Sequence, residues 1–196
     1  MKRLCLYGGT FDPVHNGHIH FAKKIVAAFL PDGLFFVPAS YSPFKQDRKH
    51  AGDTARLDML RIASQLVPAS RVSRAEIDRK GISYTLDTLM FFNAAYPDSR
   101  LFWVIGDDNL ELLHKWKGYP EHFRYCDFII LPRYHGDDLA ERIDRHPHSD
   151  QLHPLYTDTV PVSSTEIRKR IAEGKSISAF VPRAINDYIY ENELYR

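Results

Sequence analysis

The chain has 196 residues, of which 44% are hydrophobic and 26% are charged, and this fits one soluble domain or one domain with a small appendage. Its 26 basic and 25 acidic residues leave a net charge of +1, so bulk charge gives no reason to expect binding to nucleic acid or to a membrane surface. No apolar run approaches the roughly 18 residues of a membrane-spanning helix, and no signal peptide is recognisable at the N-terminus. We therefore expect a cytoplasmic protein, with Cys5 and Cys126 as buried free thiols because both lie in apolar runs.

The most informative stretch runs from Gly8 to His18 and reads GGTFDPVHNGH. It follows an apolar segment, residues 3–7, that predicts a buried strand, and it precedes apolar residues at helical spacing. The glycines and both histidines are therefore expected in a turn between strand and helix, where backbone N–H groups can approach a phosphate. His15 and His18 are three residues apart, so they are expected to share one face and to donate hydrogen bonds to phosphoryl oxygens.

Each part of this stretch also has an ordinary structural explanation, since glycine pairs are common in such turns and histidines often cap helices. The whole string is more specific than its parts. It resembles the signature of the nucleotidyltransferase superfamily. Within that superfamily, its particular residues resemble those of the nicotinate-nucleotide adenylyltransferase family. The resemblance implies that Gly8, Gly9, Thr10 and Phe11 belong to the nucleotide site.

A second buried strand is predicted over residues 34–38, after the helix stop at residues 31–33. Strand, helix and strand in this order predict a right-handed parallel crossover, which places ligands at the carboxyl ends of the strands. Lys45 follows at that edge, and by itself it reads as a solvated charge. Relatives often carry the sequence PPHK here, whereas this chain has SPFK, so the resemblance implies a phosphate contact for Lys45 and puts Phe44 in place of a histidine.

Two further elements are expected before the next motif. A helix over about residues 55–66 has its apolar side chains at helical spacing, with Asp53 or Thr54 as the N-cap. The alternation of residues 72–77 predicts a third strand.

Residues 82–89, ISYTLDTL, begin a helix that is expected to run to about Tyr96, with Ser83 or Thr85 as its cap. The string resembles the SYTxDTL motif of the same family. There the resemblance implies that backbone N–H groups at the helix start hold a pyridine carboxylate, a role that needs no charged side chain. Thr85 is the residue that we expect at this contact.

The most apolar strand, residues 101–105, is followed by the sequence GDDNL. Gly106 permits close approach of the backbone to a base or ribose. Asp107 can hydrogen-bond a ribose hydroxyl or hold a metal through water, and a purely structural role of Asp107 or Asp108 as an N-cap is the alternative. The resemblance favours the functional interpretation for Asp107.

Trp116 lies between two lysines, and an aromatic face beside positive charge suits a planar anionic ring. The resemblance implies that it stacks on the pyridine ring. A fifth strand, residues 127–133, ends at Arg133, which either borders the substrate site or is an ordinary strand-end arginine. The polar stretch 134–154 is expected to hold a helix over about 138–145 and a surface loop, and its histidines match no zinc pattern.

A last short strand is expected over residues 155–160. The sequence PVSSTEIRKR that follows opens a helix in which Ser163 and Glu166 form a capping box, and Gly174 ends it. This string resembles the ISSTxIR motif of the family. The resemblance implies that the helix start and its arginine hold the triphosphate tail, a role that falls on Ser163, Ser164, Thr165 and Arg168. A final helix is expected from Pro182 to about Glu193.

Five motifs in family order thus cover nearly the whole chain. The implied fold class is α/β, a Rossmann-like doubly wound parallel sheet with a small C-terminal helical lobe. We expect one domain over residues 1–196, in which residues 1–160 form the nucleotide-binding core and residues 161–196 form the helical part.

The implied reaction joins the adenylyl group of ATP to nicotinate mononucleotide, giving nicotinate adenine dinucleotide and pyrophosphate in NAD biosynthesis. The attacking phosphate is already anionic, so direct in-line attack needs no general base, and catalysis rests on positioning and charge stabilisation. The resemblance assigns catalysis to His15, His18, Lys45 and Arg168, with Mg²⁺ bound mainly through ATP phosphates and water.

Three alternatives remain open at the level of sequence. The acceptor is nicotinamide mononucleotide or another phosphate ester, or the protein binds a dinucleotide without turnover. A dehydrogenase is disfavoured because no GxGxxG occurs. The sequence gives no indication of the oligomeric state.

Overall fold

The computed structural model describes residues 1–40, 51–132 and 138–196. Within these ranges six strands form one parallel sheet in the order β3-β2-β1-β4-β5-β6. The strands are β1 (Lys2–Gly9), β2 (Gly33–Pro38), β3 (Ser70–Val72), β4 (Ser99–Gly106), β5 (Cys126–Leu131) and β6 (Leu152–Pro154). The chain builds outward from β1 to β3 and then returns to build outward from β4 to β6, so the expected doubly wound α/β fold is confirmed.

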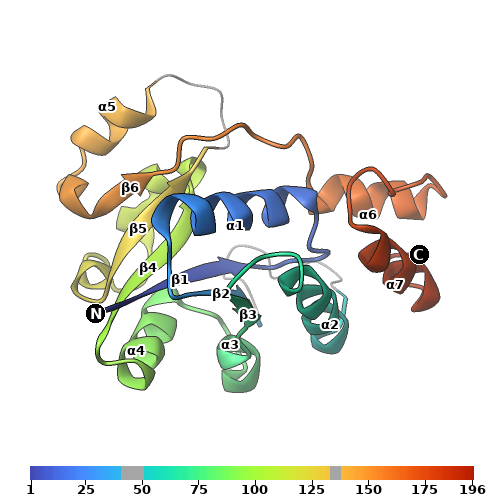
Figure 1. Ribbon diagram of the computed structural model, residues 1–196, viewed down its shortest axis with the longest axis horizontal. Helices are drawn as coiled ribbons and strands as arrows, with labels where there is room; N and C mark the ends of the chain where they lie inside the picture. The colour runs from blue at the N-terminus through green and yellow to red at the C-terminus, as the bar shows by residue number, and fades with distance from the viewer. Residues whose placement is uncertain (41–50, 133–137) are drawn as a thin grey trace.

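The connections between the strands are mostly helical (Figure 1). The α-helices are α1 (Asn16–Phe29), α2 (Asp53–Ser64), α3 (Ala75–Arg79), α4 (Thr85–Ala95), α5 (Leu139–Asp144), α6 (Ser164–Ala172) and α7 (Arg183–Glu191). Short 3₁₀ segments are η1 (Asp107–Lys115), η2 (Glu121–Arg124) and η3 (Ser149–Gln151).

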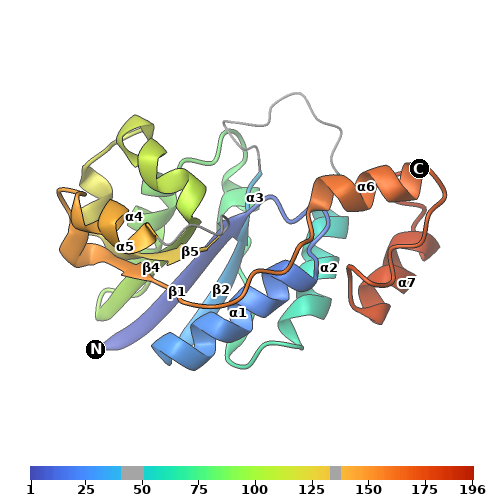
Figure 2. The ribbon, with the colours of Figure 1, turned by 90° about the horizontal axis from the view of Figure 1, so that it is seen from above.

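The two faces of the sheet carry separate hydrophobic cores, because successive residues of a strand point to opposite sides. On one face Tyr7 and Phe36 pack with buried residues of α1 and α2. On the other face Leu6 and Trp103 pack with α4, η1 and α5. Figure 2 shows α1 and α2 on one side of the sheet and α4 on the other.

The helices α6 and α7 lie together at one end of the molecule in both views (Figures 1 and 2). Their buried isoleucines, Ile167, Ile171, Ile185 and Ile189, belong to the same core as α1 and α2. The expected helical lobe is therefore present and packs onto the sheet domain. The division of the chain at residue 160 stays a prediction.

The strand predicted over residues 72–77 is wrong. Strand β3 ends at Val72, and residues 75–79 form the helix α3. The neighbours Glu76 and Ile77 are both buried, which a strand with one solvent face does not allow but a short helix wedged between β2 and α4 does.

The strand predicted over residues 155–160 is also wrong. Parallel pairing with β5 ends at Pro154, and the chain then crosses α1 on its way to α6 (Figures 1 and 2). The His20 ring on α1 lies 3.0 Å from the carbonyl oxygen of Asp158 and 3.3 Å from the Thr157 hydroxyl. This segment is irregular because it contacts the helix α1, whereas a strand would need a neighbouring strand with which to form hydrogen bonds.

Several expected helix caps are absent. Gly52 precedes α2 and Tyr84 precedes α4, and neither makes a side-chain cap; η1 begins after Gly106 rather than after an aspartate cap. The cap at Ser163 is confirmed, since its hydroxyl accepts a hydrogen bond from the backbone N–H of Glu166 at 3.1 Å.

Both cysteines are buried free thiols, as expected. Burial raises the pKa of the Cys5 thiol to about 12 and that of Cys126 well above its ordinary value. Among the described helices, none is long and apolar enough to cross a membrane.

Candidate active site

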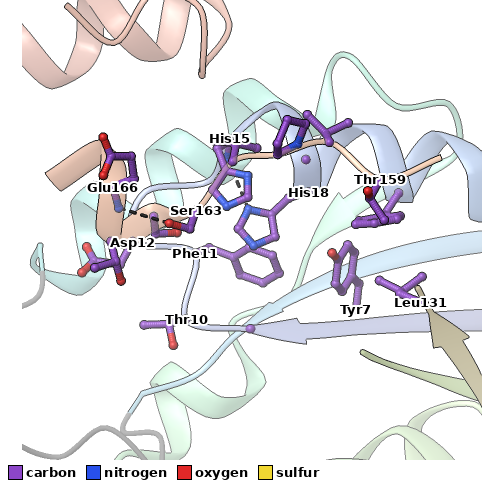
Figure 3. A pocket seen from close by; sticks show the side chains of 18 of the residues that line it. Tyr7, Thr10, Phe11, Asp12, His15, His18, Leu131, Thr159, Ser163 and Glu166 are labelled. Atoms are coloured by element: carbon purple, nitrogen blue, oxygen red, sulfur yellow. Dashed lines mark hydrogen bonds between the residues drawn. The ribbon is translucent and has the colours of Figure 1, made fainter. Parts of the chain in front are cut away.

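A pocket of about 650 Å³ opens at the carboxyl end of the sheet. The ends of β1 and β5, the start of α1 and the start of α6 line it (Figure 3). It thus lies beside the point where the strand order reverses between β1 and β4, which is where doubly wound sheets bind their ligands.

The two glycines of the first motif are the last residues of β1 and pair in register with β2, so their predicted place in a turn is corrected. A Cβ at Gly8 would lie 2.5 Å from the ring of Trp103, and a Cβ at Gly9 would lie 2.9 Å from the ring of Phe11. Glycine is therefore required here for packing beneath the pocket, besides any contact that the backbone makes with a ligand.

The turn that follows is anchored by Phe11, which adopts a positive φ of 50° and is almost fully buried. Its ring packs edge-on against Tyr7 at 5.6 Å and His18 at 4.9 Å between centroids. Phe11 thus forms an apolar floor of the pocket on which one imidazole rests (Figure 3).

His15 and His18 are held by each other. His15 is the N-cap of α1 and is buried, whereas His18 lies inside the first helical turn rather than in the turn before it. The backbone N–H of His15 donates to Nδ1 of His18 at 3.3 Å, and the two rings stack with centroids 3.7 Å apart. Because Nδ1 accepts, the neutral His18 ring carries its proton on Nε2, which is then a hydrogen-bond donor.

The start of α6, with Ser163 and Glu166, lies beside the turn that follows β1 and holds Asp12 (Figure 3). The Ser164 hydroxyl donates to the carbonyl oxygen of Pro13 at 2.9 Å. Arg168 donates from Nη1 to the carbonyl oxygen of Asp12 at 2.6 Å and from Nη2 to the Thr165 hydroxyl at 3.3 Å. Two motifs about 150 residues apart in sequence are therefore hydrogen-bonded to each other and line one pocket.

Two buried charged residues of this region escaped the sequence analysis. Arg56, on α2, is 2% exposed and donates from Nη1 to the carbonyl oxygens of Thr10 at 2.9 Å and Ala39 at 2.7 Å. Asp12 is 1% exposed and accepts a hydrogen bond from the Tyr195 hydroxyl at 2.7 Å. Asp12 stands inside the first motif, whereas nothing in the sequence distinguishes Arg56 from a surface arginine.

Four other predicted residues do not line this pocket: Thr85, Gly106, Asp107 and Trp116. Gly106 ends β4 next to Leu131 of β5, which does line it. Asp107 is buried, and Arg142 of α5 donates to its backbone oxygen at 2.8 Å. Nη1 of the same arginine lies 3.9 Å from Oδ2 of Asp107, so the Asp107 carboxylate is paired with Arg142 at the carboxyl edge of the sheet.

Trp116 is half-buried and packs against the hydrophobic core on the face of the sheet that carries α4. The residues that follow it contact the start of α4: Nζ of Lys117 lies 4.0 Å above the ring of Tyr84, and Gly118, with a positive φ of 86°, fits closely against Leu86. The segment that follows Trp116 thus contacts the residues on either side of Thr85, the first residue of α4.

Lys45, Phe44 and Arg133 lie outside the described residues. Within the described ranges, no group of three or more His, Cys, Asp and Glu side chains is placed to hold a metal ion.

Comparison with known proteins identifies the family. A family model described as cytidylyltransferase-like matches residues 6–170. Nicotinate-nucleotide adenylyltransferase of Bacillus subtilis is 34% identical over 198 residues, which cover 100% of this chain and 99% of that protein. A probable nicotinate-nucleotide adenylyltransferase of Opitutus terrae is 37% identical, with 99% of this chain and 98% of that protein covered.

Solved structures agree on the fold. Nicotinic acid mononucleotide adenylyltransferase of Plasmodium falciparum, complexed with NaAD, superposes with a TM-score of 0.81 at 19% identity, covering 100% of this chain and 98% of that one. The fold, the full-length identity and the order of the motifs agree, and the chain belongs to the nicotinate-nucleotide adenylyltransferase family.

Proposed function

We propose that this chain transfers the adenylyl group of ATP to nicotinate mononucleotide, forming nicotinate adenine dinucleotide and pyrophosphate in NAD biosynthesis. The observation that carries the proposal is the identity of 34–37% over essentially the full length with relatives of that name. A pocket that combines paired histidines, an arginine and two helix starts supports it.

The reaction needs little covalent chemistry from the protein. A phosphate oxygen of nicotinate mononucleotide forms a bond to the α-phosphorus of ATP, and the bond from that phosphorus to the bridging oxygen of pyrophosphate breaks. The nucleophile is anionic, so no proton has to be removed before attack. The protein therefore acts by alignment and by stabilising charge on the phosphoryl oxygens.

The histidines suit the α-phosphate. His18 has a defined tautomer through its Nδ1 contact, so its Nε2–H is oriented before substrate arrives, and preorganised donors stabilise a transition state without reorganisation. We assign His18 to the α-phosphate and His15 to orienting the phosphates beside it.

The start of α6 suits the pyrophosphate end of ATP. Helix N-termini bind anions, and α6 presents Ser163, Ser164 and Thr165 there together with the guanidinium of Arg168. We assign Lys45 to the acceptor phosphate and Arg133 to the border of the substrate site. Both assignments stay predictions, since both residues lie outside the described ranges.

The acceptor end is assigned to the surface near the start of α4. Backbone N–H groups at Thr85 would receive the pyridine carboxylate, and the half-buried ring of Trp116 would stack on the pyridine. Gly106 ends β4, which lies between the two strands whose ends line the pocket, and Asp107 follows it. We assign Asp107 to the ribose and Gly106 to the base.

Mg²⁺ fits this site as an ion carried by ATP. Two carboxylates, Asp12 and Glu166, line the pocket, and Asp12 already accepts two hydrogen bonds. A loosely held ion bound mainly by phosphates and water matches that donor set, because Mg²⁺ keeps several waters in such sites. When bound, it neutralises charge on the triphosphate.

Pyrophosphate release tests the function. The protein is incubated with ATP and Mg²⁺ and, in parallel, with nicotinate mononucleotide, nicotinamide mononucleotide and phosphopantetheine. Release is expected with the acid mononucleotide and far less with the other two. Pyrophosphate release only with nicotinamide mononucleotide, or only with phosphopantetheine, would show that the acceptor is that compound. Tight binding of the dinucleotide without any pyrophosphate release would identify a non-catalytic binding protein.

A further inference from the structure

The hydroxyl of Tyr195, in the turn after α7, reaches Asp12, which lines the nucleotide pocket. After α7 the chain turns back through positive φ values at Glu193 and Tyr195, and the backbone N–H of Leu194 donates to the carbonyl oxygen of Ile189 at 3.0 Å. Leu194 and Tyr195 then pack against the core beneath the pocket. The Tyr195 hydroxyl donates to Oδ1 of Asp12 at 2.7 Å.

Asp12 is a carboxylate on the wall of a site for phosphates. Its negative charge would repel ATP unless donors compensate it. The backbone N–H of Ala51 donates to Oδ1 at 3.0 Å, and Nη1 of Arg168 lies 3.8 Å from Oδ2. The same Nη1 also donates to the carbonyl oxygen of Asp12 at 2.6 Å, so Asp12 lies within reach of the guanidinium that the proposed function gives to ATP.

We propose that Tyr195 is a positioning residue, whose hydroxyl holds the Asp12 carboxylate so that Arg168 keeps the orientation in which it binds the pyrophosphate end of ATP. The inference rests on the proposed function, because it takes ATP as the ligand of the pocket.

The physical reason is the demand of a buried carboxylate for hydrogen bonds. Removing the hydroxyl takes one donor from Asp12, and a buried charge with fewer donors attracts the nearest cation more strongly. Among the described residues the ion-pair partner of Asp12 is Arg168, which would then be drawn from the phosphates toward Asp12. Burial and the Asp12 carboxylate raise the pKa of the Tyr195 phenol above its ordinary value, so the phenol stays a donor at working pH.

Tyr195→Phe tests the inference against a matched control. Tyr188→Phe removes the same kind of bond in the same lobe, since the Tyr188 hydroxyl donates to Oδ2 of Asp58 at 3.1 Å, and Asp58 does not line the pocket. We expect the KM for ATP and the calorimetric Kd for ATP to rise about tenfold in Tyr195→Phe, with kcat within about twofold and with Tyr188→Phe close to wild type.

The Asp12→Asn background separates positioning from packing. If Tyr195 acts through the carboxylate, Tyr195→Phe in Asp12→Asn changes ATP affinity by less than about twofold, because the charge that the hydroxyl held is gone. A packing role would give the same loss in both backgrounds. If Asp12→Asn fails to fold, the effect of Tyr195→Phe on ATP affinity is measured in Arg168→Lys instead, where it should likewise be smaller than in the wild-type background.

Three results would overturn the proposal: equal ATP affinity of Tyr195→Phe and wild type, the same loss in Tyr188→Phe, or the same loss in both backgrounds. Failure of the proposed function would look different. The wild type would then release no pyrophosphate with nicotinate mononucleotide, while calorimetry with ATP would still report on Tyr195.

Discussion

His15 and His18 form a stacked pair at the start of α1, with ring centroids 3.7 Å apart and planes inclined by 26°. The backbone N–H of the first residue fixes Nδ1 of the second, and the ring of Phe11 supports His18 from below. One imidazole is thereby held in orientation and in tautomer before any ligand enters the pocket.

His18→Ala is therefore expected to lower kcat by about a hundredfold or more, the usual loss when one aimed donor is removed from a transition state. Steady-state pyrophosphate release measures it, and the melting temperature shows whether the fold survives. His20→Ala is the control, because His20 is on the same helix and contacts Asp158 outside the pocket. Turnover near the wild-type rate in His18→Ala would remove His18 from the mechanism.

Trp116→Ala is expected to weaken binding of the pyridine mononucleotide by about tenfold, as loss of a stacking partner and its packing does, while the KM for ATP changes little. The half-buried ring packs in the core on the α4 face of the sheet and does not line the pocket assigned to ATP, so binding of the two substrates should respond differently. Separate titrations of each substrate at saturating levels of the other measure the effect. Equal weakening of both would contradict the stacking assignment.

Arg56 supports the turn that lines the pocket, so its replacement is expected to lower the free energy of unfolding. Arg56→Met leaves the carbonyl oxygens of Thr10 and Ala39 without their donor, so we expect unfolding to become easier by about 2–4 kcal/mol. Urea denaturation measures it. Arg61→Gln, on the same helix but exposed, should change the free energy of unfolding by less than about 0.5 kcal/mol, and equal effects of the two variants would show that the buried contacts of Arg56 contribute little.

Short local motifs explain why the sheet topology and the walls of the pocket where α1 and α6 begin could be predicted from the sequence. The GGTFDPVHNGH stretch and the cap at Ser163 are short-range patterns, and the doubly wound sheet brings their elements to one edge. The contact of Asp12 with Tyr195 joins residues 183 positions apart, and no periodicity reports such a pair. The helix α3 was missed for a related reason, since burial of Glu76 is decided by its partners and not by its own hydropathy.

Glu76 itself predicts a pH dependence of stability. Burial raises the pKa of its carboxyl above the ordinary 4.5, although hydrogen bonds from Thr88 and Ser83 and the charge of Arg79 oppose the shift. A folded-state pKa above the unfolded value means that the native protein binds the proton more readily, so stability from this group is present at low pH and is lost as pH rises through the raised pKa.

Glu76→Gln imitates the protonated carboxyl, so its melting temperature relative to wild type is expected to rise between pH 4.5 and pH 8. Glu173→Gln is the control of opposite sign, because a hydrogen bond from Lys175 lowers the pKa of Glu173 below 4.5. Its melting temperature relative to wild type should fall as the pH rises toward 4.5 and stay nearly constant above it. Thermal melts at several pH values measure both variants. A difference for Glu76→Gln that stays constant with pH would mean that this carboxyl titrates alike in the folded and unfolded chain.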